Sequence, residues 1–366
     1  MTGRSAKVVV VGGGYAGAVA AKMLDDVADV VVVEPRDTFV HNVAALRAAV
    51  DPLWAERLFL PYDRLLKHGR VVHERAVRTS ARAVQLGSGA VLPADFVVIA
   101  TGSTYPFPAK FDIDDRAAAL ARFGALHREL REAGHVLLVG AGAVGLEFAG
   151  EIKAAWPDKR VTLLDQGPEL MPGGFPEPFR AELRRQLDRL GVGLLLGSPL
   201  IALPRTEPGR AAAFRVTTAS GLEISADIWF RCFGEAPVSD HLDEELSAAR
   251  QPDGRLSVTP ALRIAGQERV FAAGDVTALP ELKLARAASR HAEVVAQNIR
   301  ALMEGREAPA VYRPAPDGIV LPLGPKGGAG YSPETGAVFG PDQTAELKGE
   351  LFLGRFRALL GIEAEG

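Results

Sequence analysis

The sequence has one cysteine, no long apolar run and no surplus of either charge. Because Cys232 is alone, the chain can form neither an internal disulfide nor a two-cysteine redox centre, and we expect a reducing, cytoplasmic compartment. The first apolar run, at residues 8–11, is too short for a signal sequence or a membrane span. A formal net charge of −3 disfavours a nucleic-acid partner.

The size and composition of the chain predict several domains and no metal centre. Its 366 residues exceed what one hydrophobic core usually organises, and 48% of them are hydrophobic, so we expect two or three domains. The seven histidines show no ligand spacing with cysteines or acids. The sequence therefore predicts no metal site.

A glycine-rich segment near the N-terminus predicts a dinucleotide-binding fold. Gly12, Gly14 and Gly17 have the GxGxxG spacing, after a β-branched run and before an amphipathic stretch. We expect a strand, a tight turn and a helix whose N-terminus faces a pyrophosphate. Glu34 closes the next predicted strand, where an acid can accept a hydrogen bond from a ribose hydroxyl. The alternative is an ordinary glycine turn between a strand and a helix.

The same arrangement recurs in the middle of the chain. Gly140, Gly142 and Gly145 repeat the spacing, and Asp165 ends the matching second strand. No arginine directly follows Asp165, so the site favours the 2′-hydroxyl of NADH over the 2′-phosphate of NADPH. The alternative for Asp165 is a solvated acid at a strand end.

Two dinucleotide sites in one chain suggest two dinucleotides that react together, most simply a bound flavin and a diffusing nicotinamide nucleotide. The layout resembles the pyridine nucleotide-disulfide oxidoreductase superfamily, in which the N-terminal site holds FAD. Three further segments carry the resemblance, and they contain Thr101 with Gly102, Gly234 and Asp275. It implies that Asp275 contacts the ribityl chain of the flavin.

The redox cysteine pair of the disulfide reductases is absent, and Cys232 is interpreted as a small core residue. Residues 39–49 and 100–111 instead resemble the ferroptosis-suppressor branch of the apoptosis-inducing-factor family, whose members reduce quinones with NAD(P)H. Without a dithiol, electrons that reach the flavin must leave to an external acceptor. The resemblance implies that this acceptor is a quinone.

The resemblance also assigns roles around the flavin. It places His41 and Asn42 on a loop that approaches the flavin, where the histidine could donate a hydrogen bond or a proton. It makes Arg47 a phosphate or flavin contact. The alternatives are a helix-capping histidine and a surface arginine.

Three charged residues complete the set that the resemblance implies. Glu147 would touch the nicotinamide amide, Lys283 would assist a helix N-terminus that faces the flavin pyrimidine, and Lys348 would be a flavin-proximal lysine. Phe352 would match an aromatic residue of the acceptor pocket. The alternatives are a dipole-stabilising Glu147, a solvated Lys283 and, for the segment with Lys348, a helix packed on the core.

The fold class expected is therefore α/β, with two Rossmann-like domains and a small α+β C-terminal domain. We assign residues 1–108 and 251–304 to a discontinuous FAD domain, 109–250 to an NAD(P)H domain and 305–366 to the C-terminal domain. Within the last, 313–342 predicts a β-hairpin, and 347–362 is an amphipathic stretch compatible with a helix or a strand and a helix. That stretch could cover the flavin, rest peripherally on a membrane, or pack on the core.

Three functions remain open from the sequence. The first is an NADH-oxidising, FAD-dependent quinone reductase. The second is a reductase that donates electrons to a ferredoxin or another protein acceptor. The third is a redox-sensing flavoprotein with slow turnover. The sequence carries no signal for the oligomeric state.

Overall fold

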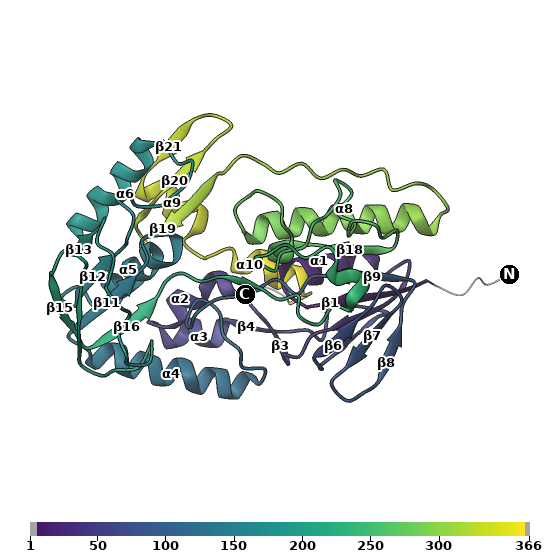
Figure 1. The fold of residues 1–366 in the computed structure, drawn as a ribbon, viewed down its shortest axis with the longest axis horizontal. Helices are drawn as coiled ribbons and strands as arrows, with labels where there is room; N and C mark the ends of the chain where they lie inside the picture. Colours follow the sequence, from purple (N-terminus) through teal and green to yellow (C-terminus); the bar gives the residue numbers. More distant parts are fainter. Residues whose placement is uncertain (1–5, 363–366) are drawn as a thin grey trace.

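The computed structural model describes residues 6–362, which form two sheet-based halves with a smaller C-terminal part beside them (Figure 1). One half contains a five-stranded parallel sheet, and four of its strands are almost continuous runs of buried valine and other apolar residues. Such runs are typical of parallel strands that are covered on both faces. The strand order is β18 (Val270–Ala272), β9 (Phe96–Ile99), β1 (Lys7–Val11), β2 (Asp29–Val33) and β5 (Arg70–Val72).

This first sheet combines strands from both ends of the range that the sequence analysis gave to the FAD domain. Helices α1 (Tyr15–Leu24) and α8 (Ala285–Met303) pack together against it, although they are far apart in the sequence. Small antiparallel sheets and short helices surround it: β3 (Thr38–Val40), β4 (Phe59–Pro61), β6 (Ala76–Thr79), β7 (Ala83–Leu86), β8 (Val91–Pro93), η1 (Asn42–Ala44), α2 (Ala45–Ala48), α3 (Pro52–Arg57), α7 (Glu244–Ser247) and η2 (Gly274–Val276).

The second half repeats the design with a four-stranded parallel sheet. Its order is β13 (Val192–Leu195), β12 (Arg160–Leu164), β11 (His135–Val139) and β16 (Ile228–Arg231). The short strands β10 (Ser103–Thr104) and β17 (Ala236–Pro237) pair where the chain crosses between the halves. The remaining elements are α4 (Arg116–Glu132), α5 (Ala143–Ala155), α6 (Glu177–Arg189), β14 (Phe214–Thr217) and β15 (Glu223–Ala226). The α/β class expected from the sequence is confirmed.

Close backbone contacts require a glycine at the first position of both motifs. Gly12 has φ of +101°, and a Cβ there would lie 2.4 Å from the carbonyl oxygen of Ala100. Gly140 has φ of +118°, and a Cβ there would lie 2.8 Å from the carbonyl oxygen of Cys232. L side chains rarely adopt such backbone angles, so glycine is the residue that fits each turn. Cys232 itself is a buried core residue, as interpreted from the sequence, and burial raises the pKa of its thiol to about 12.

The C-terminal part differs in detail from the expected hairpin and amphipathic stretch. Residues 313–342 contain three antiparallel strands, β19 (Ile319–Pro322), β20 (Gly328–Ser332) and β21 (Ala337–Phe339), in place of a two-stranded hairpin. Residues 347–362 are broken between α9 (Pro341–Lys348) and α10 (Leu353–Leu359). The break occurs because Leu351 and Phe352 adopt left-handed φ angles of +51° and +60°.

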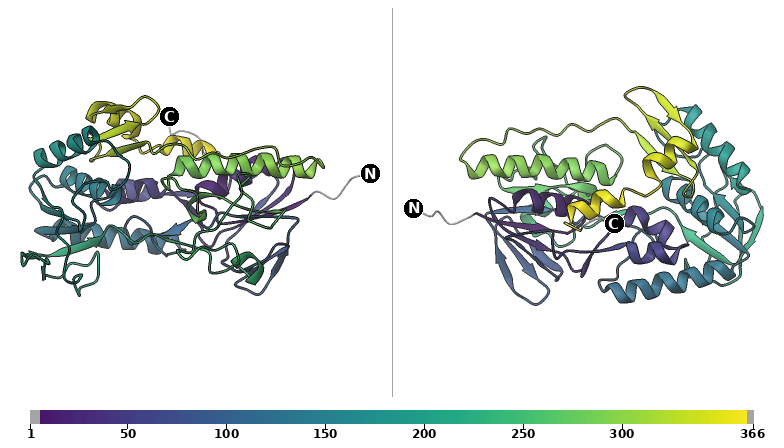
Figure 2. Two further views of the ribbon diagram at one scale, coloured as in Figure 1. Left: turned by 45° about the horizontal axis from the view of Figure 1, so that its top comes forward. Right: turned by 180° about the vertical axis from the view of Figure 1, so that it is seen from behind.

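Helix α10 does not stay with the C-terminal sheet. Seen from behind, it lies against the N-terminal half of the molecule (Figure 2). The ring of Phe356 takes part in this contact, and its centroid lies 4.7 Å from that of Tyr15 and 6.0 Å from that of Phe39. The left-handed break thus turns the chain so that an apolar helix face can reach the first half.

A buried ion pair joins the three parts of the molecule. The guanidinium of Arg47 in α2 contacts the carboxylate of Glu151 in α5 at 2.8 Å, and both side chains are buried. Arg47 also donates to the carbonyl oxygen of Gly349, just after α9, and lies 5.2 Å from the ring centroid of Trp54. Burial raises the pKa of Glu151, and the bonds from Arg47 oppose that effect. Arg47 therefore connects elements of both halves and of the C-terminal part.

Among the described residues, no helix has the length and apolar character needed to cross a bilayer. Within residues 6–362, no three His, Cys, Asp or Glu side chains gather closely enough to hold a metal ion.

We expect Arg47→Ala to destabilise the protein strongly. It leaves the Glu151 carboxylate buried without its partner, and breaking a buried pair in this way costs about 3–5 kcal/mol. Denaturant unfolding followed by circular dichroism measures the change in the free energy of unfolding. The double variant Arg47→Met, Glu151→Leu should be more stable than Arg47→Ala, because no charge remains buried.

Arg116→Ala, which breaks an exposed pair with Glu56, is the control and should change stability by less than about 1 kcal/mol. Equal losses for Arg47→Ala and Arg116→Ala would contradict the assigned role.

Candidate active site

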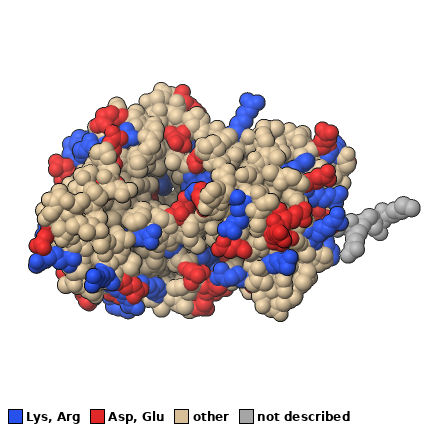
Figure 3. All heavy atoms as spheres, in the orientation of Figure 1, with Lys and Arg blue, Asp and Glu red and all other residues tan. Residues whose placement is uncertain are grey.

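A cavity of about 1840 Å³ lies where the three parts of the molecule meet. Pockets for single drug-sized ligands usually measure about 300–1,000 Å³, so this one has room for more than one ligand. It extends from the first glycine loop to the C-terminal part, and a hollow is visible between the two halves in Figure 3. Of the residues expected to act, the following line it: Gly12, Gly14, Glu34, Asn42, Thr101, Gly102, Glu147, Asp275, Lys283 and Lys348.

The first glycine loop forms an open cradle at one end of this cavity. Gly14 is the N-cap of α1, and a Cβ added there would meet no atom within 4 Å. The first amide groups of a helix have no partner within the helix, and together with the helix dipole they favour an anion. This open cradle, directly before a helix, fits the pyrophosphate of a dinucleotide. Gly142 has the same open position before α5.

Each glycine loop is fixed by the acid that ends the second strand of its half. The amide of Gly13 donates to Glu34 at 2.7 Å, and the amide of Ala141 donates to Asp165 at 2.7 Å. The sequence analysis assigned both acids to ribose binding and did not foresee these bonds. A carboxylate has about four acceptor sites, so the bonds leave capacity for a ribose hydroxyl. Glu34 lines the cavity, whereas Asp165 lies outside its lining.

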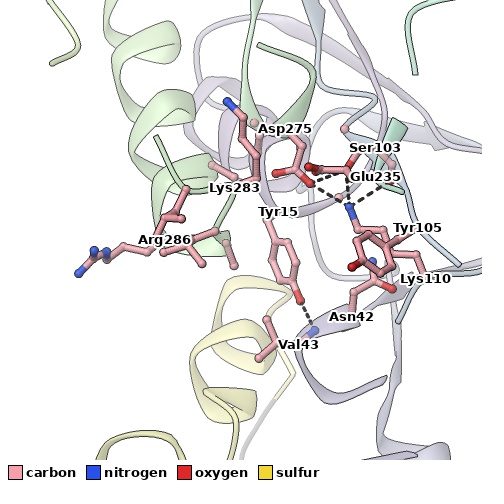
Figure 4. Close-up of a pocket in the computed structure, with 18 of the residues that line it drawn as sticks. Tyr15, Asn42, Val43, Ser103, Tyr105, Lys110, Glu235, Asp275, Lys283 and Arg286 are labelled. Carbon is pink, nitrogen blue, oxygen red and sulfur yellow. Dashed lines mark hydrogen bonds and ion pairs between the residues drawn. The ribbon is translucent and has the colours of Figure 1, made fainter. Parts of the chain in front are cut away.

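The cavity wall around Asp275 is a polar network that the sequence analysis missed in part (Figure 4). The Asp275 carboxylate contacts the ammonium of Lys110 at 2.8 Å and the hydroxyl of Ser103 at 2.8 Å. Burial opposes ionisation of Asp275, but the charge and hydrogen bond of Lys110 outweigh burial and lower its pKa. The Glu235 carboxylate lies 2.8 Å from the same hydroxyl of Ser103, so the two acids share its single proton. Lys110 belongs to the segment 100–111 that carried the family resemblance, which is the signal that could have found it.

Two other expected residues stand beside this network. The ammonium of Lys283 donates to the carbonyl oxygens of Thr277 and Leu279, each at 2.9 Å, so it holds the turn before α8 as well as lining the cavity. Burial lowers the pKa of Lys283. The hydroxyl of Thr101 donates to the carbonyl oxygen of Val238, which joins the two crossing strands between the halves.

Glu147 and Lys348 form an ion pair at the opposite end of the cavity. The Lys348 ammonium lies 2.8 Å from the Glu147 carboxylate and 3.1 Å from the carbonyl oxygen of Val320. The two residues are 201 positions apart in the sequence, on α5 and α9. Both were named as catalytic candidates for separate reasons, and the structure brings them into contact.

His41 is fully buried behind Tyr15 and does not line the cavity. Its Nε2 lies 2.8 Å from the carbonyl oxygen of Leu351, which can only accept, so Nε2 carries the proton. Its Nδ1 then accepts from the hydroxyl of Tyr15, at 3.2 Å, and that hydroxyl accepts from the amide of Val43. Burial lowers the pKa of His41 to about 4, and the charge of Lys348 acts in the same direction. His41 is therefore neutral at pH 7 and connects the left-handed break to Tyr15, which borders the cavity.

Two further expected residues lie away from the cavity. The guanidinium of Arg47, expected to contact phosphate or flavin, is used by the junction with Glu151 and Gly349. Gly234 has φ of +95° and packs against the guanidinium of Arg231, outside the cavity lining. The positions of these two residues in the sequence do not show that they lie away from the cavity. The second glycine loop, with Gly140, Gly142 and Gly145, also lies beyond the lining, although α5 brings Glu147 into it.

Comparison with known proteins identifies relatives that match most of the chain. Residues 6–292 match the family described as pyridine nucleotide-disulphide oxidoreductase. The chain is 30% identical to apoptosis-inducing factor homolog B of Dictyostelium discoideum, over 90% of each protein. It is 33% identical to ferroptosis suppressor protein 1 of Mus musculus, over 88% of this chain and 87% of that protein.

Solved structures share the fold. The sulfide:quinone oxidoreductase of Aquifex aeolicus superposes with a TM-score of 0.75 at 19% identity, over 97% of this chain and 92% of that chain. At this identity the likeness concerns the fold alone. The resemblance to the apoptosis-inducing-factor and ferroptosis-suppressor proteins that the sequence indicated is confirmed.

His41 predicts a loss of stability in mild acid. In the unfolded chain the imidazole has a pKa of about 6.5. Between pH 6.5 and pH 4 it is therefore protonated in the unfolded chain but neutral in the folded protein. The contribution of His41 to the free energy of unfolding is therefore present above pH 6.5 and is lost as the pH falls. The loss amounts to about 2 kcal/mol between pH 7 and pH 5. His41→Gln can keep both hydrogen bonds without titrating, so it should fall less steeply over the same range. Thermal unfolding of both proteins at several pH values measures the difference, and parallel curves would show that His41 does not contribute.

Proposed function

Because the chain belongs to the pyridine nucleotide-disulphide oxidoreductase family, as an FAD-dependent oxidoreductase, we propose that it oxidises NADH and reduces a quinone. The observation that carries this proposal is the Glu147–Lys348 ion pair, which lies in the cavity that the first glycine loop also lines. One continuous cavity thus offers a cradle for a dinucleotide, a carboxylate on the second half and an ammonium on the C-terminal part.

FAD is proposed to occupy the end of the cavity formed by the first half. Gly14 and α1 would receive its pyrophosphate, Glu34 a ribose and Asp275 the ribityl chain. When bound, the flavin supplies the redox chemistry, accepting hydride from NADH and releasing two electrons to an acceptor. The network of Lys110, Ser103 and Asp275 keeps the Asp275 carboxylate ionised and therefore able to accept hydrogen bonds from hydroxyl groups.

NADH is proposed to approach from the second half. Its pyrophosphate would lie at Gly142, the N-cap of α5, and Asp165 would accept from the adenosine ribose. Glu147 stands one helical turn further along α5, so its carboxylate can accept from the carboxamide while it pairs with Lys348. A carboxylate at position 165 repels a 2′-phosphate, which favours NADH over NADPH.

The acceptor is proposed to be a quinone that enters against the C-terminal part. Apolar side chains of that part line the cavity, among them Ile319, Phe339 and Phe352. Lys348 stands beside them, and its ammonium can donate a hydrogen bond to a quinone oxygen as that oxygen gains negative charge. The single cysteine is buried in the core, so no dithiol is present to take the electrons.

Where the C-terminal part lines the cavity, two apolar side chains are exposed at its mouth, Leu347 by 46% and Phe352 by 43%. They suit a lipid-soluble acceptor, and the peripheral membrane contact expected from this segment stays a prediction. We propose that the protein is otherwise cytoplasmic.

Anaerobic stopped-flow measurements test the acceptor. We expect NADH to reduce the flavin and a quinone then to reoxidise it faster than oxygen or a ferredoxin does. Lys348→Met should slow the quinone step at least tenfold, because a charge-assisted hydrogen bond contributes about 1.5–3 kcal/mol and 1.4 kcal/mol is a factor of ten. Lys326→Met removes an exposed lysine of the same part and is the matched control, expected to react as the wild type does. Reoxidation by the quinone no faster than by oxygen would refute the proposal.

Asp165 provides a test of the nucleotide. Asp165→Ala should raise the KM for NADH about tenfold, because it removes the ribose contact and releases the amide of Ala141. Adding Gln166→Arg should then improve the use of NADPH, because a guanidinium can pair with the 2′-phosphate. Steady-state kinetics with both nucleotides measure the ratio of kcat/KM values. An unchanged ratio in the double variant would contradict the assignment of Asp165.

A further inference from the structure

A buried cluster of polar side chains surrounds the turn that carries Asp275. This turn follows β18, and Gly274 adopts a left-handed φ of +80° within it. The amide of Gly274 donates to Nδ1 of His291 at 3.0 Å. Its carbonyl oxygen accepts from the hydroxyl of Thr277 at 2.9 Å. Both polar atoms of Gly274 are thus held by side chains, which fixes where the next residue, Asp275, enters the cavity.

The hydrogen bonds determine the tautomer of His291. An amide can only donate, so Nδ1 must be the acceptor and Nε2 must carry the proton. Nε2 then donates to the Glu281 carboxylate at 2.6 Å. The other oxygen of Glu281 accepts from the hydroxyl of Tyr312 at 2.6 Å, and the rings of Tyr312 and His291 meet edge to face with centroids 4.3 Å apart.

The cluster is costly to bury, which argues that it does more than fill space. The side chains of His291 and Glu281 are exposed by only 1% and 4%. Burial opposes ionisation of Glu281, but the hydrogen bonds from His291 and Tyr312 outweigh burial and lower its pKa. Apolar residues of similar volume usually stabilise a protein at least as well as a buried charged group with its partners. Stability alone therefore does not account for a carboxylate and an imidazole at this turn.

The position of the cluster indicates what it does. Glu281 lines the same cavity as Asp275 and Lys283, whereas His291 stands behind the turn, on the buried side of α8. The carboxylate orients the imidazole, the imidazole holds the Gly274 amide, and the turn presents Asp275. We propose that Glu281 and His291 are positioning residues, which hold the Gly274–Asp275 turn against the flavin. The hydrogen bonds through His291 set the affinity for FAD, and the negative charge of Glu281 makes flavin reduction less favourable. This inference rests on the proposed placement of FAD beside Asp275.

Four variants of the FAD-loaded protein separate the positioning of the Gly274–Asp275 turn from the effect of the Glu281 charge. His291→Leu removes the acceptor and the donor, whereas His291→Gln keeps both, since its amide carries an acceptor and a donor close together. Glu281→Gln keeps an acceptor for His291 but loses the negative charge. His135→Leu is the matched control, because His135 is a buried imidazole with two hydrogen bonds in the other sheet, to Ser225 and Thr162.

Two readouts are measured without NADH or a quinone. The first is the dissociation constant of FAD, from its fluorescence on release. The second is the ratio of reduced to oxidised flavin at equilibrium with a dye of known potential. We expect His291→Leu to weaken FAD binding at least tenfold and His291→Gln to restore it to within threefold of the wild type. We expect Glu281→Gln to bind FAD as the wild type does but to raise the reduced fraction at least threefold, because electron-rich reduced flavin is favoured when a nearby negative charge is removed. His135→Leu should match the wild type in both readouts.

The outcomes distinguish this inference from the proposed function. His291→Leu that binds FAD as tightly as the wild type, or no more weakly than His135→Leu, would overturn the inference alone. If His291→Leu does not fold, Glu281→Gln decides, and a reduced fraction equal to that of the wild type overturns the inference. A wild-type protein that holds no FAD would overturn the proposed function and this inference together.

Discussion

The geometry of the cavity depends on the buried contact of Arg47 with Glu151 and Gly349. Each of these groups comes from a different part of the molecule, and the guanidinium has donors enough to engage all of them at once. A buried guanidinium is tolerable only when its partners are present in good geometry. The three parts are therefore held in one relative position, and the walls of the cavity come from all three. The Glu147–Lys348 pair, which joins α5 to α9, depends on the same arrangement because Glu147 and Glu151 lie one turn apart on α5.

The C-terminal part is also held to the first half through His41. A neutral imidazole can donate at one nitrogen and accept at the other, and here it links the Leu351 carbonyl to the Tyr15 hydroxyl. Two successive residues with left-handed φ follow a helix at this point, which is an unfavourable conformation for side chains other than glycine. The imidazole bond and the packing of Phe356 stabilise it. As a result, Phe352 and Lys348 are presented at the same mouth of the cavity.

The role of the acid at the strand end of each half was only partly predictable from the sequence. The position of Glu34 and Asp165 at a strand end is a local pattern, so the sequence indicated that each acid stands beside a glycine loop. Their bonds to the amides of Gly13 and Ala141 depend on how the loop folds back over the strand end. The sequence indicated Asp275 through its motif, yet Lys110 and His291, which fix the carboxylate and its turn, come from distant segments.

The sequence by itself determined the α/β class, the two glycine loops and hence the pair of dinucleotides, because a left-handed turn and an open helix start are requirements that neighbouring residues express. It also excluded a redox cysteine pair within the chain, since one cysteine cannot form a pair. Only the tertiary structure decided that Arg47 joins the three parts of the molecule and that His41 stands behind Tyr15. It also decided that Glu147 meets Lys348. Arg47 and Glu151 are 104 positions apart, Glu147 and Lys348 are 201 apart, and His41 is 310 from the Leu351 carbonyl that it binds. No local pattern specifies which distant side chains the folded chain brings together.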